Sequence, residues 1–305
     1  MMLFFTLLGG VGAFFIYIYT VIKSFKFEEI QSTPIRSKIG NGSNYDQNSG
    51  NNIDNMVLNI LLLGVDGVSK NDRGRSDTIL VISLNVRTKK IKIVSIMRDT
   101  WCVIPKHGSD RINAAYSYGG ANLTAETIQL NFGIPIDRYV WVKFDDFVVI
   151  INILGGIDLN LTTSEVNYIN KYSGYRPQLI GSGFFLLNGI QTLRHAQNRN
   201  SIGSDYDRTR RQRDILIALF NKSKNLNLIQ LASFISNIIP MINTNFNSRE
   251  IAKLTSNISK YLNYNLEQLR IPTDDNVMSK TIDGKSVLVI PDKTETKQYL
   301  NFALS

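Results

Sequence analysis

The sequence predicts an α/β domain that follows an N-terminal membrane anchor and a polar linker. The first 22 residues carry no charge, residues 28–55 are rich in Asn, Ser and Gly, and beyond them short strand-like runs alternate with longer helical patterns. With 305 residues and 43% hydrophobic side chains, the chain can bury a large core. We find no internal repeat and no second linker, so residues 58–305 are expected to form one domain.

The first segment is long and apolar enough to cross a bilayer. As a helix, residues 1–22 would measure about 33 Å at roughly 1.5 Å per residue. A buried helix of a soluble protein is the alternative, but this run is apolar all round and precedes a polar segment. It also lacks the basic start and small-residue cleavage site of a signal peptide. We therefore expect a transmembrane helix at 1–22 and a flexible linker at 23–57. Lys23 and Lys26, counted alone, would place the domain that follows in the cytoplasm.

Two strand-like runs near the start of the domain predict a β-hairpin. They occupy residues 78–86 and 90–97, and a short turn at 87–88 joins them. With the turn at that place, Asp77 is expected to face Arg98 across the open end of the hairpin.

A third strand is expected to bring further acidic groups to the same end of the sheet. The apolar run at 59–65 is typical of a buried central strand, and Asp66 follows it. If this strand runs alongside the second arm of the hairpin in the same direction, Asp66 joins Asp77, Arg98 and Asp99 at one edge. Carboxylates that meet there repel unless a cation lies between them, and Mg²⁺ is the natural candidate beside a phosphate. The alternative is a carboxylate and arginine network that only locks the hairpin end.

The rest of the chain alternates between helices and strands. Glycines at 133 and 155–156 favour helix ends. The expected helices lie at 121–131, 145–154, from 189 to the arginine-rich segment, 227–242, 248–262 and 296–304. The expected strands lie at 139–144, 157–161, 184–187 and 286–290.

The arginine-rich segment at 194–213 holds six arginines and two aspartates in twenty residues. Guanidinium groups at this density suit a phosphate cluster, which they bind in a bidentate manner. Ser204 and Asp207 have the spacing of a capping box, so a helix is expected to begin near Tyr206.

On that helix, Arg208 and Gln212 share a face with the apolar residues that follow, whereas Arg210 and Arg213 point elsewhere, as ordinary solvent-facing charges. Polar groups that face inward at a helix start, where the backbone also favours anions, are typical of an anion site. An ion pair between Arg208 and Asp205 is the alternative, and the segment alone does not choose between them.

The composition excludes several classes of function. A net charge of +9 and a pI near 9.5 favour an anionic partner. The arginines cluster beside carboxylates and no nucleic-acid motif is present, so no nucleic acid is expected. Cys102 is the only cysteine, which excludes an intrachain disulfide. His107 and His195 are the only histidines, and without cysteine partners they do not form a zinc site of the usual spacing. The sequence also gives no support for a catalytic triad of serine, histidine and a carboxylate. His195 is expected to pack locally.

Seven motifs occur in an order that resembles the LytR-CpsA-Psr family of membrane-anchored glycopolymer transferases. They are LLLGVD, GRSDTILVISLN, SIMRDTWCVIP, RINAAYSYGG, FDDFVVIINILGGIDLN, LNGIQTLRHAQNR and DYDRTRRQRDIL. The resemblance runs from about Leu58 to Ala303. It implies a three-layer α/β/α domain with a mixed central sheet and an apolar slot for a prenyl chain.

The implied activity is a Mg²⁺-dependent phosphotransfer at the extracytoplasmic face of a membrane. A phospho-glycan would move from a polyprenyl-pyrophosphate carrier to a cell-wall acceptor such as peptidoglycan. The alternatives are a hydrolase that releases the same group to water, and a non-catalytic polyprenyl-phosphate-binding or regulatory membrane protein. The membrane would be a bacterial plasma membrane, or a plastid membrane if the gene is organellar.

The resemblance assigns roles to residues that match the family's motifs. Asp66 and Asp77 are implied to hold Mg²⁺, and Asp77 and Arg98 to be catalytic. The pyrophosphate is implied to be bound by Arg75, Arg98, Arg199, Arg208 and Gln212.

The chain departs from the family at one position. Where the family has Tyr-Ala-Arg-x-Arg, this chain has Gln197 in place of the first arginine. An amide still donates a hydrogen bond but lacks the charge, so weaker donor binding or a different donor is expected. Asp99 and Asp205 are expected to orient Arg98 and Arg208.

Overall fold

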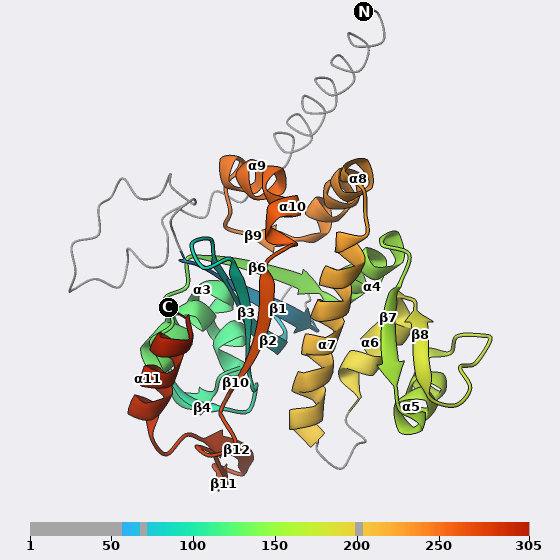
Figure 1. Cartoon of the computed structure of the whole chain (residues 1–305). Helices are drawn as coiled ribbons and strands as arrows, with labels where there is room; N and C mark the ends of the chain where they lie inside the picture. The colour runs from blue at the N-terminus through green and yellow to red at the C-terminus, as the bar shows by residue number, and fades with distance from the viewer. Residues whose placement is uncertain (1–56, 68–71, 199–203, 305) are drawn as a thin grey trace, which may run out of the picture.

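The computed structural model describes residues 57–67, 72–198 and 204–304, and a six-stranded mixed sheet lies at its centre (Figure 1). The strands follow the order β10-β3-β2-β1-β6-β9 across the sheet. Their bounds are β1 (Val57–Asp66), β2 (Arg75–Asn85), β3 (Lys90–Ile96), β6 (Arg138–Lys143), β9 (Asn243–Thr244) and β10 (Asn265–Ile271). The α/β class that the sequence predicts is confirmed.

The three central strands have the predicted directions. β2 and β3 form the hairpin, and Leu80 lies opposite Ser95 in a register that, when extended, places Asp77 opposite Arg98. β1 pairs antiparallel with β2 and parallel with β6. β1 and β3 therefore run in the same direction, but β1 lies beside the first arm of the hairpin, whereas the hypothesis from the sequence placed it alongside the second. The carboxyl ends of β1 and β3 reach the same edge of the sheet.

A β-bulge interrupts the pairing of β1 with the start of β2. Gly64 lies opposite Thr78, but the next residue, Val65, lies opposite Ser76, so the register skips Asp77. A bulge bends its strand and redirects the side chain of the extra residue. Here it turns Asp77 toward the end of β3.

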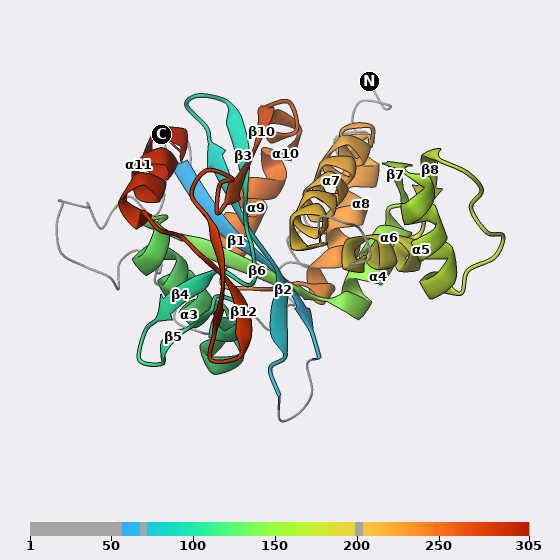
Figure 2. The same ribbon diagram turned by 90° about the horizontal axis from the view of Figure 1, so that it is seen from below.

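Helices cover both faces of the sheet, as the two views in Figures 1 and 2 show. On one face, α3 and α11 contribute Ile128 and Leu300 to a buried core that includes Val81. On the other face, residues of α7, α9 and α10 pack near Leu84 and Ile91. The bounds of these helices are α3 (Ala114–Phe132), α7 (Ser204–Lys224), α9 (Ser248–Ser256), α10 (Ile258–Tyr261) and α11 (Lys293–Leu304).

A separate core lies beside the sheet and joins it through α7. Ile215 of α7 is buried there with Ile151, Leu159 and Leu187. The surrounding elements are α4 (Phe144–Ile153), β7 (Ile157–Leu161), α5 (Thr163–Ser173), β8 (Gly183–Leu187), α6 (Gly189–Gln197) and α8 (Leu228–Ile238). α7 thus contacts both the central sheet and this second core, and these contacts hold the helix between them.

Several elements are absent from the sequence prediction. They are α5, β10, the hairpin of β4 (Trp101–Ile104) and β5 (Gly108–Arg111), and β11 (Met278–Ile282), which pairs with the predicted strand β12 (Lys285–Val289). These strands are short or rich in charged residues, so they show no clear alternation of apolar and polar positions.

Some helix ends differ from the prediction. α3 begins at Ala114, and its kink at Gly119 and Gly120 separates a first segment from the predicted helix. α7 begins at Ser204, two residues before the expected start near Tyr206. The expected helix at 227–242 ends at Ile238, where a 3-10 turn, η3 (Ile239–Met241), with Pro240 follows. The expected helix at 248–262 breaks at Asn257 into α9 and α10.

None of the helices within the described ranges is both long and apolar enough to cross a membrane. The predicted transmembrane helix at 1–22 lies outside the described residues, as does the linker at 23–57 except for its last residue. That residue, Val57, already belongs to β1.

Candidate active site

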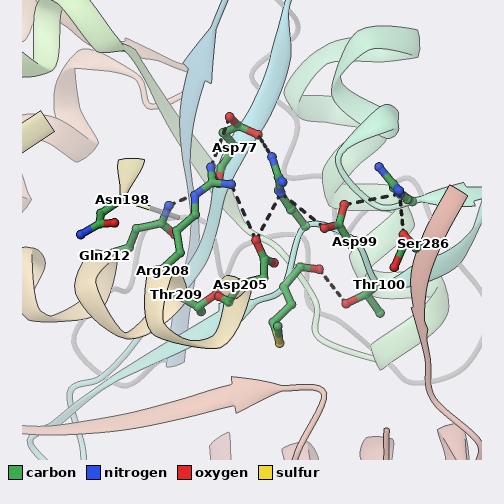
Figure 3. Close-up of polar contacts among 12 residues, drawn as sticks. Asp77, Asp99, Thr100, Asn198, Asp205, Arg208, Thr209, Gln212 and Ser286 are labelled. Atoms are coloured by element: carbon green, nitrogen blue, oxygen red, sulfur yellow. Dashed lines mark hydrogen bonds and ion pairs between the residues drawn. The ribbon is translucent and has the colours of Figure 1, made fainter. Parts of the chain in front are cut away.

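A tight turn after β3 places two charged residues at the edge of the sheet. The backbone amide and the hydroxyl of Thr100 both donate to the carbonyl oxygen of Met97, at 3.0 and 2.6 Å (Figure 3). Arg98 and Asp99 occupy the tip of this turn. The amide of Asn113 donates to the carbonyl oxygen of Arg98 at 3.2 Å and ties the turn to the start of α3.

Asp77 bridges two arginines that come from distant parts of the chain. Arg98 Nη1 lies 2.9 Å from Asp77 Oδ1, and Arg208 Nη2 lies 3.2 Å from Asp77 Oδ2. Arg208 Nη2 also donates to the carbonyl oxygen of Asp77 at 2.9 Å. The side chains of Arg98 and Arg208 are only 19% and 3% exposed, so their charges are largely removed from water. The predicted contact between Asp77 and Arg98 is confirmed.

Two further carboxylates hold the arginines in place. Asp205 Oδ1 lies 3.4 Å from Arg98 Nε and 3.7 Å from Arg208 Nη1. Asp99 lies between Arg98 and Arg111, at 3.5 and 3.4 Å from their Nε atoms. Figure 3 shows the resulting arginine–aspartate cluster, which consists of Asp77, Asp99, Asp205, Arg98, Arg111 and Arg208.

The cluster favours the charged form of its central arginine. Burial alone would lower the pKa of Arg98, but Asp77, Asp99 and Asp205 outweigh burial and raise the pKa. The three carboxylates match the three guanidinium groups in number. The six side chains of the cluster therefore carry no excess positive charge.

The first turns of α7 supply the predicted inward face. Gln212 Nε2 donates to the carbonyl oxygen of Asp77 at 3.3 Å, one helical turn from Arg208. Arg208 contacts both Asp77 and Asp205, so the ion pair expected as an alternative also exists. Arg210 is 50% exposed, as predicted. The prediction for Arg213 is wrong, because its side chain is partly buried and its Nε donates to Gln268 Oε1 on β10 at 3.1 Å.

Asp66 and Arg75 face each other at the end of the β1–β2 ladder, beyond the bulge. Both are exposed, and none of the ion pairs among the described residues involves either of them. Asp66 Oδ1 accepts a hydrogen bond from the amide of Gly67 at 2.8 Å. Gly74 has a φ of +74°, and a Cβ atom there would lie 1.9 Å from the carbonyl oxygen of Asp66. Only glycine allows the chain to approach Asp66 this closely.

Arg199 and Gln197 are the two remaining residues that the resemblance to the family singles out. Arg199 lies outside the described residues. Gln197 Oε1 accepts a hydrogen bond from Arg194 Nη1 at 2.8 Å, and Arg194 Nε donates to the carbonyl oxygen of Tyr172.

The carboxylates at this edge fit a metal ion only if a ligand completes its coordination. Within the described ranges, no three His, Cys, Asp or Glu side chains are grouped to hold a metal. Asp66 and Asp77 offer hard oxygen atoms, and a carboxylate has about four lone-pair positions, of which Asp77 uses at least two on arginines. Mg²⁺ is usually bound by one or two carboxylates together with water and phosphate oxygens. The donor set therefore fits Mg²⁺ that binds with a phosphorylated ligand.

A buried ion pair behind the cluster is missing from the sequence prediction. Arg211 Nε lies 2.8 Å from Glu165 Oε1, and Arg211 Nη1 donates to the carbonyl oxygen of Asn198 at 2.9 Å. Burial alone would raise the pKa of Glu165, but hydrogen bonds from Thr162 and Arg211 lower it to about 2. This pair anchors α7 to α5 three residues after Arg208. The Thr162–Glu165 spacing of a capping box is the signal that could have located α5.

His195 is buried beside this ion pair and is held in its neutral form. Burial, with a smaller effect of Arg211, lowers the pKa of His195 to about 4, although the charge of Glu165 acts in the opposite direction. The expectation that His195 packs locally is confirmed, since it is only 3% exposed.

We predict that this neutral histidine reduces stability in mild acid. The unfolded chain binds a proton at this imidazole below about pH 6.5, whereas the folded chain binds it only near pH 4. Because the unfolded state binds more protons in this window, the free energy of unfolding falls by about 2–3 kcal/mol as the pH drops through it. Glu165 contributes only at the acidic end of this window, since its lowered pKa begins to reduce stability as the pH falls through its ordinary value of 4.5.

Urea unfolding at neutral pH and at the acidic end of this window measures the effect. His195→Gln is expected to remove most of the pH dependence, and His107→Gln, at an exposed position, is expected to retain it. An unchanged pH dependence in His195→Gln would contradict the prediction.

The chain is similar to known proteins, and the matches extend over most of the chain in some relatives and over about half of it in others. The teichoic acid transferase TagU of Bacillus mycoides, named polyisoprenyl-teichoic acid–peptidoglycan teichoic acid transferase, is 29% identical over 287 residues, which is 93% of this chain and 88% of TagU. TagU of Bacillus licheniformis, which has the same name, is 33% identical over 174 residues, 56% of this chain. The match spans 54% of the length of the B. licheniformis TagU, so the chain spans about half of this relative.

The fold is also similar to solved structures. The crystal structure of TagV from B. subtilis superposes with a TM-score of 0.67 at 26% identity, and the match covers 83% of this chain and 98% of TagV. The family model described as the LytR_cpsA_psr family matches residues 18–301. Because this match includes nearly all of the described residues and the cluster around Asp77, the chain belongs to the LytR_cpsA_psr family.

Proposed function

We propose that this protein is a Mg²⁺-dependent phosphotransferase that moves a phospho-glycan from a polyprenyl-pyrophosphate carrier to a cell-wall acceptor such as peptidoglycan. The observation that carries the proposal is the carboxylate of Asp77, shared by the buried guanidinium groups of Arg98 and Arg208. The names of the TagU relatives support the class of donor and acceptor.

In this reaction, an acceptor hydroxyl attacks the phosphorus atom that carries the glycan. A new P–O bond forms, the bond to the carrier phosphate breaks, the hydroxyl proton is lost, and polyprenyl phosphate leaves. Arg98 and Arg208 are held where they donate to phosphoryl oxygens as negative charge shifts to the leaving phosphate. Asp205 and Asp99 orient the two arginines.

The charge balance of the cluster supports a role for Mg²⁺. Three aspartates already match its three arginines, so a pyrophosphate needs further positive charge to bind. Exposed Arg75 supplies one positive charge, and we expect Arg199 to supply another. Mg²⁺ held by Asp66 and Asp77 would neutralise the phosphoryl oxygens further. Gln212 would donate to the pyrophosphate from the same face of α7 as Arg208.

The N-terminal segment gives the proposed location. We propose a transmembrane helix at 1–22 and a domain on the extracytoplasmic face of a bacterial plasma membrane, or of a plastid membrane if the gene is organellar. An anchor of this kind would keep the domain close to a carrier that is itself embedded in the membrane.

The activity is tested with the full-length chain in lipid nanodiscs, a polyprenyl-pyrophosphate-linked glycan and Mg²⁺, with and without a peptidoglycan fragment. Free polyprenyl phosphate is quantified. We expect its release to require the acceptor. Release without the acceptor would instead identify a hydrolase, and binding of the donor without release would identify a non-catalytic carrier-binding protein.

Removal of the metal is expected to stop the transfer. Chelation with EDTA should reduce the rate at least about 100-fold, because the phosphoryl charge loses its main counter-charge, and added Mg²⁺ should restore it. Asp66→Ala should raise the Mg²⁺ concentration needed for half-maximal rate, whereas Asp158→Ala, at an exposed carboxylate on β7, should not. Full activity in EDTA would remove Mg²⁺ from the proposal and leave the arginines as the only source of positive charge.

A further inference from the structure

A stacked pair of aromatic rings lies exposed beside the cluster. The rings of His107 and Tyr118 are 4.7 Å apart between centroids and nearly parallel, at 11°. Tyr118 is 43% exposed, and His107, in the turn between β4 and β5, is exposed as well. Aromatic rings stabilise a fold most when they are buried, so an exposed stacked pair is a candidate binding surface.

Tyr118 is fixed next to the segment that leads into β2. Arg73 Nη1 donates to the carbonyl oxygen of Tyr118 at 3.2 Å. The hydroxyl of its neighbour Ser117 donates to the carbonyl oxygen of Gly74 at 2.7 Å. The glycine kink of α3 follows Tyr118 immediately, so this residue ends the first helical segment. These contacts hold the backbone at Tyr118 against the segment at 73–74 that leads into β2.

A network of polar contacts connects the rings to the cluster. The hydroxyl of Tyr118 donates to Asp110 Oδ2 at 3.0 Å, and Lys285 Nζ lies 2.8 and 2.9 Å from the two oxygens of Asp110. Asp110 Oδ1 also accepts from the amide of Arg111, whose side chain belongs to the cluster.

The contacts of Asp110 leave specific groups for a ligand. They fill about four acceptor positions, the capacity of one carboxylate, so Asp110 organises the surface and does not bind the ligand itself. Lys285 is 46% exposed and uses two of its three protons on Asp110. Its third proton and the acceptor positions of the Tyr118 oxygen remain for a ligand.

We propose that His107 and Tyr118 form a saccharide-binding platform: a sugar ring of one of the two reactants stacks on an outer face of the stacked pair, while Lys285 and the phenolic oxygen of Tyr118 bind its hydroxyl groups. Pyranose rings present C–H groups on one face, which pack on the electron-rich face of an aromatic ring, and hydroxyls at the edge. The proposal rests on the proposed function, because the sugar belongs either to the transferred glycan or to the acceptor.

The test compares Tyr118→Ala and Tyr118→Phe with Tyr172→Ala in the full-length chain. Tyr172 is a matched control on α5, since it is 42% exposed and its ring contacts that of Tyr168. We measure the KM for the lipid-linked donor and for the peptidoglycan fragment separately. Tyr118→Ala is expected to raise one of them by about tenfold or more, Tyr118→Phe by less, and Tyr172→Ala to leave both unchanged.

The affected substrate identifies the origin of the sugar. A raised KM for the fragment alone assigns the platform to the acceptor, and a raised KM for the donor alone assigns it to the transferred glycan. If the Tyr118→Ala variant keeps the wild-type KM for both substrates, including the case in which only its kcat falls, the proposal of a saccharide-binding platform is overturned.

Direct binding separates this proposal from the proposed function. Saturation-transfer NMR with a soluble peptidoglycan tetrasaccharide, and with the donor glycan released from its lipid, requires no turnover. If the wild type transfers nothing but binds one saccharide in a Tyr118-dependent way, the platform stands and the transferase fails. If transfer occurs and saccharide binding does not depend on Tyr118, only the platform fails.

Discussion

Asp77→Asn is expected to reduce kcat for phospho-glycan transfer by about 100- to 1,000-fold, the range found when one preorganised electrostatic group is lost from an active site. The carboxylate of Asp77 is within 3.2 Å of both Arg98 and Arg208, and an amide cannot pair with two guanidinium groups. The arginines would lose their common orientation, and the proposed metal site would lose one of its two carboxylates.

The rate is measured as acceptor-dependent release of polyprenyl phosphate at saturating donor. Asp158→Asn is the matched control. Asp158 is exposed, its Oδ2 lies 3.7 Å from Lys222 Nζ, and the variant should retain the wild-type rate. Thermal unfolding and circular dichroism establish that both variants fold. A folded Asp77→Asn variant with a rate within about threefold of wild type would rule out Asp77 as a catalytic group, because the expected loss is far larger.

Arg208→Lys is expected to lower kcat/KM by about 100-fold or more, although the charge is retained. The guanidinium group of Arg208 contacts the side chain and the carbonyl oxygen of Asp77 while only 3% exposed. A lysine ammonium is a point charge and cannot reproduce the planar fork that makes these contacts together.

Arg210→Lys provides the control on the same helix, two residues away. Arg210 is half exposed and forms ion pairs with Asp207, Asp214 and, at 3.6 Å, with Glu165, none of which belongs to the cluster around Asp77. We expect it to change kcat/KM by less than about twofold. Equal losses in the two variants would show that α7 responds to any change of charge and that Arg208 has no specific role.

The register of the central hairpin could be predicted because it depends on local information. Two apolar runs separated by a short turn fix which residues face each other, and side chains alternate with a period of two. The contact between Asp77 and Arg98 followed from this register. The place of Asp66 did not, because it depends on the bulge between Gly64 and Val65, which leaves no signal in the sequence.

The face of α7 could be predicted only in part. The spacing of Arg208 and Gln212 placed both on the inward face of the helix, and in the structure both donate to the carbonyl oxygen of Asp77. The same spacing also connects Arg208 to Arg211, yet Arg211 is buried because it pairs with Glu165, 46 residues earlier in the chain. A helical pattern indicates which residues share a face, but not which distant carboxylate neutralises each of them.

The aromatic platform lies beyond what the sequence indicates. His107 and Tyr118 come from different elements, and the hairpin of β4 and β5 that carries His107 was not predicted. The two glycines after Tyr118 are a readable signal for a break in the helix. The stacking itself depends on how α3 packs against that hairpin.

The most direct test of the central claim follows the phosphate between the glycan and the carrier. The acceptor fragment is analysed by mass spectrometry after reaction, and the released lipid is quantified in the same sample. The proposed phosphotransfer predicts that the acceptor gains the glycan together with one phosphate, and that an equal molar amount of polyprenyl monophosphate appears. Transfer of the glycan without its phosphate, with release of polyprenyl pyrophosphate, would contradict the account of the cluster around Asp77.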